Sequence, residues 1–300
     1  MSLSFRSVLP VASPITALAA LPRCANRFCL RPPSLWQRWW ARHEGTWLEE
    51  QWYCSPDCFY DGLCTCLENA STLTLRRTPR PNRLPLGLVL LSRQEITAHQ
   101  LRQALATQHS TGSGKIGEWL VRMGAISEEQ VTNALAAQHG CAVFAAREPQ
   151  ALPATMHWPR TLTEAFRAVP VFYNPAQSNL YVGFLEGVDH SFLYSVERML
   201  QCRTEACILP PSVFQRNAER CAAPWESETI VIHQRQNPFE MAQAISNYAQ
   251  QVQAERCAVT ACANHLWIRL RCSSGFHVDF LFRTAVGPDR RSSATRGMND

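Results

Sequence analysis

The chain has 300 residues, of which 46% are hydrophobic, so it is long enough for two or three small domains with cores of their own. Its 29 basic and 24 acidic residues give a net charge of +5, which is too mild to indicate a nucleic-acid partner by itself. The sequence has no uninterrupted apolar run long enough to predict a transmembrane helix. Thirteen cysteines, an odd number spread through expected core segments, favour a reducing compartment, the cytoplasm, over a disulfide framework.

The two ends of the chain show no pattern of regular structure. Residues 1–22 are moderately apolar, carry Arg6 as their single basic residue and are interrupted by Pro10 and Pro14. We expect a disordered leader there, with a signal peptide as the alternative because the fit to that pattern is weak. Residues 285–300 are expected to be a disordered tail.

Two close cysteine pairs lie within residues 23–67. The first is a C-x4-C pair and the second a C-x3-C pair in the phrase WYCSPDCF. Each pair can close a tight turn that brings two thiolates to one tetrahedral metal ion, and a segment this short has little other core. The sequence therefore predicts a small Cys-rich domain with a structural zinc ion held by Cys24, Cys29, Cys54 and Cys58.

Other interpretations of this segment remain open. The cysteines could be buried reduced thiols, and Cys64 or Cys66 could replace Cys58, whereas His43 stands alone and is a poorer candidate ligand. A catalytic zinc site keeps one position open beside three protein ligands, so four cysteines favour a closed, structural site. The segment resembles small treble-clef or ribbon domains that end in a YCSxxC knuckle, although those domains usually have two residues between the first two cysteines.

Residues 68–82 have the composition of an extended linker, because they contain Pro79 and Pro81 among several arginines. An arginine-rich linker beside a zinc knuckle also raises the hypothesis of a nucleic-acid binder, whose affinity would fall steeply with salt. The modest net charge makes this the weakest of the functional hypotheses.

An internal duplication occupies the next stretch. Residues 85–108 and 115–138 align with a shift of thirty positions, and such self-similarity is the signature of a structural repeat. Eight of the twenty-four aligned residues are identical: Gly87/Gly117, Leu90/Leu120, Ile96/Ile126, Gln100/Gln130, Ala104/Ala134, Leu105/Leu135, Ala106/Ala136 and Gln108/Gln138.

Each copy predicts a short helix, a break and a longer capped helix. Thr97 with Gln100, and Ser127 with Gln130, have the spacing of a capping box. Gly124 lies where the short helix of copy two must end, a position that often needs positive φ. Copy one has Gln94 at the equivalent position. Apolar residues four apart, Leu101 with Leu105 and Val131 with Leu135, share a helix face, and we expect the two copies to pack together through such faces.

The rest of the chain predicts two α/β segments, one within residues 83–222 and one over 226–284. The patterns indicate strands at Val169–Tyr173, Leu180–Phe184, Thr204–Leu209 and Thr229–His233, a helix capped by Asp189, a helix at Pro238–Gln253, and strands at Cys257–Thr260, Leu266–Leu270 and Val278–Phe282. The expected fold class is therefore α+β and multidomain.

The familiar catalytic motifs are missing. The phrase GSGK at Gly112–Lys115 is not a P-loop, because His109 and Ile116 stand where the motif needs a glycine and a hydroxyl residue. It is expected to be the turn between the repeats. Cys257, Cys262 and His265 form a conceivable Cys–His site, but alternation along these strands favours buried structural thiols. We therefore expect a protein that is not an enzyme.

Both copies resemble the repeat in the N-terminal domain of type II secretion and type IV pilus assembly ATPases, the general secretory pathway protein E N-terminal family. The family pattern is R-L-G-x-x-L-hydrophobic-x-x-G-hydrophobic, a spacer, and L-x-x-x-L-x-x-Q. The stretches His139–Phe144 and Ala168–Leu209 extend the resemblance, and residues 226–284 faintly resemble the small domain that precedes the motor. The resemblance implies a bacterial adaptor or regulator without the motor, which would bind a component of a secretion or pilus machine.

Some members of this family bind cyclic di-GMP through the repeat, which implies an alternative function here. The family's binding positions correspond in this chain to Leu86, Gly87, Gln108, Lys115, Ile116, Gly117, Gly124 and Gln138. The family's arginine is replaced by Pro85 and Lys115, although Arg83 lies two residues upstream of the first. Lysine offers a point donor and proline none, where arginine offers a planar fork to a guanine edge.

Overall fold

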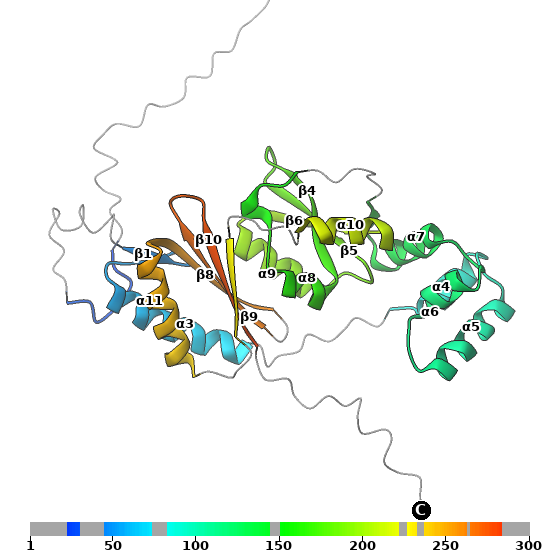
Figure 1. Cartoon of the computed structure of the whole chain (residues 1–300), viewed down its shortest axis with the longest axis horizontal. Coiled ribbons are helices and arrows are strands. Elements are labelled where there is room, and N and C mark those ends of the chain that lie inside the picture. The colour runs from blue at the N-terminus through cyan, green and yellow to red at the C-terminus, as the bar shows by residue number, and fades with distance from the viewer. Residues whose placement is uncertain are drawn as a thin grey trace, which may run out of the picture. The chain divides into compact units, whose positions relative to one another are not determined.

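The computed structural model describes residues 23–30, 45–73, 83–144, 151–221, 227–232, 237–262 and 265–283 (Figure 1). The expected leader and tail, residues 74–82 of the expected linker, and His43 lie outside the described residues. The chain divides into two compact units. Unit 1 comprises Met1–Asn69, Gln236–Cys257 and Leu270–Ser273, and unit 2 comprises Ala70–Arg235, Ala258–Arg269 and Ser274–Asp300.

The protein is of the α+β class and contains two mixed sheets. One sheet has the strand order β2-β1-β8-β9-β10-β7 and the other the order β3-β6-β5-β4. The strands are β1 (Thr46–Leu48), β2 (Gln51–Tyr53), β3 (Ala142–Val143), β4 (Ala168–Asn174), β5 (Asn179–Phe184), β6 (Arg203–Ile208), β7 (Ser227–Ile232), β8 (Ala254–Cys262), β9 (His265–Cys272) and β10 (His277–Arg283). The seven strands predicted from the sequence are found to within a few residues of their expected ends.

The helices are α3 (Pro56–Leu73), α4 (Leu86–Ser92), α5 (Ala98–Thr111), α6 (Ile116–Arg122), α7 (Glu128–His139), the 3-10 turn η1 (Ala154–Met156), α8 (Arg160–Phe166), α9 (His190–Leu200), α10 (Pro211–Cys221) and α11 (Pro238–Gln251). Helices α8 and α10 were not predicted. Helix α3 runs into the stretch expected to be a linker, because Phe59, Leu63, Leu67 and Ala70 continue one buried face along it.

In unit 1 the Cys-rich segment shares a sheet with the C-terminal segment. Strand β1 pairs antiparallel with β2 and parallel with the start of β8, where Leu48 lies opposite Cys257. The Glu49 amide donates to the Cys257 carbonyl at 2.8 Å, and the Thr46 hydroxyl donates to the Ala254 carbonyl at 3.2 Å. The sequence predicts these two segments as separate domains, because a pairing between residues so far apart leaves no local pattern.

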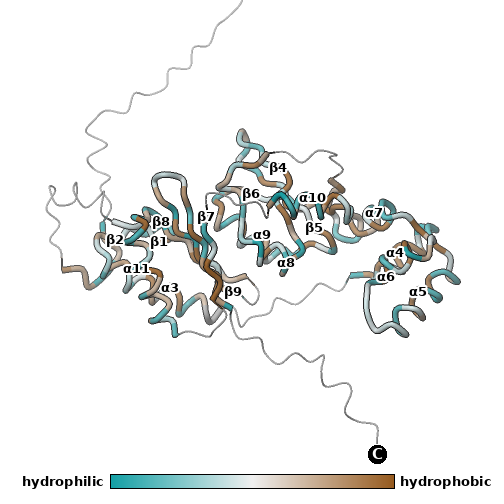
Figure 2. The backbone as a smooth tube through the Cα atoms, viewed as in Figure 1, coloured by the Kyte–Doolittle hydropathy of each residue, from teal (hydrophilic) through white to brown (hydrophobic). Residues whose placement is uncertain are grey.

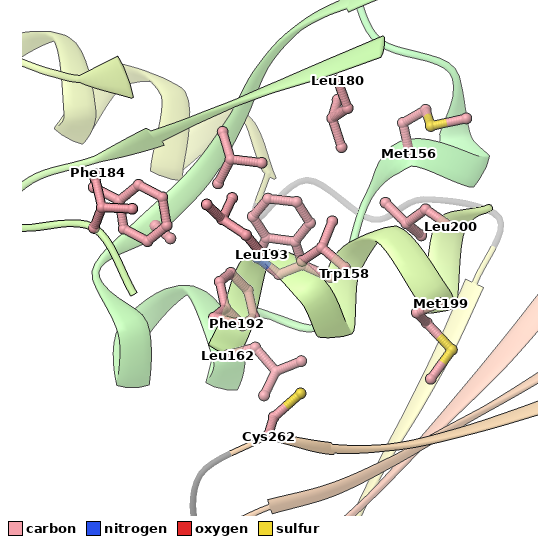
Figure 3. Packing of buried hydrophobic residues seen from close by; sticks show 14 of the residues in the cluster. Met156, Trp158, Leu162, Leu180, Phe184, Phe192, Leu193, Met199, Leu200 and Cys262 are labelled. Carbon is pink, nitrogen blue, oxygen red and sulfur yellow. The ribbon is translucent and has the colours of Figure 1, made fainter. Parts of the chain in front are cut away.

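The core of unit 2 surrounds helix α9, as Figure 3 shows. Phe192, Val196 and Met199 on this helix are fully buried. The cluster also contains side chains of β5, the α8 region and the C-terminal strands: Leu180, Phe184, Trp158, Leu162, Cys262, Trp267 and Leu281. The helix begins as predicted, because the Asp189 carboxylate accepts hydrogen bonds from the amides of Ser191 and Phe192.

A buried ion pair lies among these apolar residues. Strand β9 mixes hydrophobic and hydrophilic residues, as the hydropathy colours of Figure 2 show for the chain, and Arg269 on this strand is only 1% exposed. Its guanidinium binds both carboxylate oxygens of Asp279 at 2.8 Å and donates to the His157 carbonyl at 2.7 Å, while the Trp267 indole donates to Asp279 at 2.7 Å. The network thus ties the segment before α8 to β9 and β10, with its charges paired.

Candidate functional site

The four cysteines predicted to bind zinc lie together in unit 1. The Sγ atoms of Cys24, Cys29, Cys54 and Cys58 are all within 4.8 Å of one another, and those of Cys29 and Cys54 are 3.5 Å apart. A tetrahedral zinc ion with Zn–S bonds of about 2.3 Å places its sulfur atoms about 3.8 Å apart. The cluster therefore matches the donor type, number and approximate spacing of a four-cysteine metal site.

Local hydrogen bonds hold the two cysteine pairs in place. Cys54 follows β2, and Cys58 lies in the first turn of α3, where its amide donates to the Ser55 hydroxyl at 3.3 Å. In the first pair, the Cys29 amide donates to the Asn26 carbonyl at 3.2 Å, and the Asn26 side chain donates to Asp61 on α3 at 2.9 Å. The two turns are thus attached to each other independently of a metal.

The chemistry of the cluster favours a bound cation. Burial, and next the hydrogen bonds with Cys29 and Cys24, raise the pKa of the Cys54 thiol well above its usual range. Burial also raises the pKa of Cys58. The Cys54 and Cys58 thiols therefore resist ionisation on their own, and a divalent cation in the cluster would supply the opposing charge that stabilises thiolates.

The remaining candidate cysteines are not part of the cluster. Cys64 is buried on α3 and Cys66 is half-buried on the same helix. Cys257 and Cys262 are buried thiols, and burial raises the pKa of Cys262 to about 12. A thiol so reluctant to ionise is a poor nucleophile, which agrees with the structural role expected for it.

In unit 2 the two repeat copies pack together through equivalent side chains. Their shared core consists of three pairs of residues related by the thirty-residue shift: Leu90/Leu120, Ile96/Ile126 and Ala104/Ala134. Helix α5 of copy one contacts α6 of copy two, and α4 contacts α7. The duplication is therefore also a structural one, as the sequence predicted.

The predicted turns and caps of the repeat are present. Both capping boxes form, with the Thr97 hydroxyl accepting from the Gln100 amide and the Ser127 hydroxyl from the Gln130 amide, each at 3.2 Å. Gly124 has a φ of +68° and Gln94 a φ of +59°, so both copies keep the left-handed residue. The GSGK phrase is the turn between α5 and α6, as expected.

The last glutamine of each copy bonds to the residue just before the other copy. Gln108 of copy one donates through its side chain to the Gly114 carbonyl at 2.8 Å. Gln138 of copy two donates to the carbonyl of Leu84, the position equivalent to Gly114. This reciprocal exchange gives the pair of copies an approximate two-fold relationship and fixes where each short helix starts.

The paired glycines of the repeat allow each short helix to approach the long helix of its own copy. A Cβ atom on Gly87 would lie 2.7 Å from Leu101, and one on Gly117 would lie 3.0 Å from Val131, the equivalent residue. The Gly117 position also adjoins Leu86 of copy one. The candidate residues Leu86, Ile116 and Gly117 therefore belong to the packed junction of the copies, whereas Gly87 packs against Leu101 within copy one.

The loop between β5 and α9 holds copy two in unit 2. Glu186 in this loop forms ion pairs with Lys115 and, at 3.7 Å, with Arg167. The Val188 amide donates to Nδ1 of His139 at 3.1 Å, and the Arg83 guanidinium contacts the same ring. Burial, and next the charges of Arg83 and His190, lower the pKa of His139 to about 4, so the neutral ring accepts this bond at neutral pH.

One expectation for the repeat is wrong. Leu101 packs against the shared core, but Leu105 on the next turn is 47% exposed. Ala104 takes the inward position instead. It lies on the side of the helix nearly opposite Arg102 and Ala106, which are both exposed. The equivalent Leu135 contacts the core around α9, so the two long helices differ in what covers their outer faces.

Neither a family model nor a curated protein matches the chain. The chain is structurally similar to MshE with cdg, at 24% identity and a TM-score of 0.39, over 46% of this chain and 99% of that one. It is also similar to the N-terminal domain of XpsE in two crystal forms, at 19% and 21% identity with TM-scores of 0.34 and 0.28, over 45% and 44% of this chain and 92% and 90% of those. Among the described residues, no helix combines the length and apolarity needed to cross a membrane.

Proposed function

We propose that this chain is a non-catalytic adaptor or regulatory protein of a bacterial secretion or pilus assembly machine. The observation that carries the proposal is the reciprocal packing of the two repeat copies. Equivalent residues form one core, and Gln108 and Gln138 each bond to the residue just before the opposite copy. Such a unit presents helix faces in a fixed geometry, which suits binding of a protein partner.

The proposed partner is a cytoplasmic part of such a machine, by the sequence resemblance described above. With the intact chain as bait in its own cells, we expect capture of a secretion or pilus component. The buried Leu120→Asp variant should lose that component, because it disrupts the core shared by the copies. The exposed Glu118→Gln variant on the same helix is the matched control. Capture unaffected by Leu120→Asp, or turnover of a nucleotide by the pure chain, contradicts the proposal.

A second candidate function is binding of cyclic di-GMP. The observation that favours it is the meeting of candidate residues from both copies, where Gly117 of copy two adjoins Leu86 of copy one. Gln138 lies near the same place, because it bonds to Leu84 just before copy one. The internal bonds of these groups oppose it. Lys115, which stands at the family's arginine position, is already paired with Glu186, so a ligand would have to displace that carboxylate.

Calorimetry with cyclic di-GMP on three versions of the chain tests this candidate. If Lys115 contacts the ligand, Lys115→Ala weakens binding and Glu186→Gln strengthens it, because the amide no longer competes for the ammonium group. No heat at tens of micromolar protein rejects binding. Equal affinity of all three versions rejects Lys115 as a contact.

For the four-cysteine cluster we propose structural zinc, since all four ligand positions belong to the protein. Metal analysis of the purified chain should find one zinc ion per chain. Cys54→Ser should lose it, and Cys64→Ser, which changes a buried cysteine outside the cluster, should retain it. Zinc retained by Cys54→Ser, or absent from the unaltered chain, contradicts this assignment.

A further inference from the structure

The two long helices of the repeat have equivalent outer faces, and the described residues cover only one of them. On α7 this face consists of Thr132, Leu135, Ala136 and His139. Thr132 and Ala136 are 2% and 4% exposed, and Leu135 and Ala136 pack in the core around α9. The β5–α9 loop completes the cover through the bond from Val188 to His139.

The counterpart on α5, the outer face formed by Arg102, Leu105, Ala106 and His109, is open. All four residues are exposed. They occupy the positions of the α7 residues shifted by thirty, and helical geometry places them on one side of α5, away from the buried Ala104. In the part of the chain that the structure describes, copy one therefore repeats the shape of this face without the elements that cover it in copy two.

The chemistry of the open face differs from that of its counterpart. Arg102 replaces Thr132, so an apolar surface like the one around α9 would bury an unpaired charge here. Helix α5 contains no acidic residue, whereas α7 begins with Glu128 and Glu129. A partner for the α5 face must therefore carry a carboxylate for Arg102 and an apolar group for Leu105.

We propose that the outer face of α5 is the docking surface for a partner protein that presents an acidic segment with an apolar side chain at its centre. This inference rests on the proposed adaptor function and assigns it to one face. The partner packs against α5 in the place that the α9 core takes against α7. Charge on Arg102 steers and orients the partner, and contact with Leu105 and Ala106 excludes water.

A photo-crosslinking residue at position 105 of the full chain, in its own cells, locates the partner. The control position is Tyr194, an exposed aromatic residue on α9. We expect crosslinks from position 105 to one protein, within a peptide of net negative charge, and few from position 194. Crosslinks to a second copy of this chain, to a peptide without acidic residues, or to no protein overturn the proposal.

Affinity measurements with the crosslinked segment, made as a synthetic peptide, test the charge. Arg102→Gln and Gln103→Glu change the net charge equally, but Gln103 lies about 100° around the helix from Arg102. Arg102→Gln should weaken binding about fivefold and Gln103→Glu less than twofold. Equal losses overturn the assigned face. Crosslinks from position 194 alone reject the α5 face as the docking surface but leave the adaptor function standing. If neither position gives a crosslink and the intact bait captures no partner, both the docking surface and the adaptor function are rejected.

Discussion

Gln94 and Gly124 occupy the same position in the two copies, and both have a left-handed backbone. A side chain in this conformation costs about 1 kcal/mol, which glycine avoids. We predict that Gln94→Gly stabilises copy one by about 0.5–1 kcal/mol, and that Gly124→Ala destabilises copy two by about 1 kcal/mol. No neighbouring atom lies within 4 Å of a Cβ added at Gly124, so the loss there comes from the backbone alone.

Two measurements check both changes: chemical denaturation of each variant, and hydrogen exchange of the Leu90 and Leu120 amides. Arg93→Gly is the control for Gln94→Gly, because Arg93 has an ordinary right-handed backbone with a φ of −84°. That variant should destabilise α4. A destabilising Gln94→Gly would mean that the glutamine side chain contributes more than its backbone costs.

Asp279 is a second residue at which a single substitution is expected to change the free energy of unfolding strongly. It is 2% exposed and receives bonds from both Arg269 and Trp267. Asp279→Ala leaves the buried guanidinium without its partner and should cost about 3–5 kcal/mol. The double variant Arg269→Met/Asp279→Leu should lose less than the single one, because no buried charge remains. Thermal unfolding of both variants measures the difference, and equal losses would show that packing rather than charge dominates.

At the scale of elements, the loop Leu185–Asp189 makes the stability of unit 2 depend on pH. The pKa of His139 is lowered from 6.5 to about 4. Between these values the unfolded chain binds a proton that the folded chain does not, so the free energy of unfolding falls as the pH drops from about 6.5 to about 4. We predict that His139→Gln, which keeps an acceptor near Val188, reduces this loss.

Denaturation at pH 7.5 and pH 4.5 measures the effect. Buried His157, whose pKa is also lowered to about 4, leaves part of the slope in place. The exposed equivalent of His139 in copy one, changed as His109→Gln, is the control for replacing a histidine at this position of the repeat. An unaltered slope in His139→Gln contradicts the role given to the bond from Val188.

Local sequence patterns predicted the helices and turns whose end signals lie within a few residues. They did not predict the pairing of strands that are far apart in the sequence. The capping boxes, Gly124, the Asp189 cap and the cysteine spacing are signals within a few residues, and the structure has each feature where it was expected. The pairing of β1 with β8 depends on the surface that unit 1 builds, which no local pattern records. The outward turn of Leu105 escaped because its spacing from Leu101 fits either side of α5.

At the scale of the whole molecule, the two units differ in how their cores are held. Unit 2 has an extended apolar core around α9, whereas the described residues of the Cys-rich part of unit 1 form two three-residue strands, one helix and the four-cysteine cluster. Short segments of this kind usually depend on a metal, whose binding energy is also folding energy. The Cys-rich part in turn supplies the strand that pairs with the start of β8.

We therefore predict that removing the metal opens unit 1 and spares the α9 core. With a chelator, hydrogen-exchange protection should be lost at β1, β2 and the first turn of α3, and reduced at Ala254–Cys257, whose carbonyls bond to Thr46 and Glu49. Protection of α9 and β5 should remain, because all four cysteines of the cluster lie in unit 1. Cys54→Ser should reproduce the pattern and Cys64→Ser should not.

Two outcomes would contradict this prediction. Metal release with protection of β1 intact would show that the hydrogen bonds through Asn26 and Ser55 hold the cluster without a metal. Loss of protection in α9 would show that both units depend on the ion.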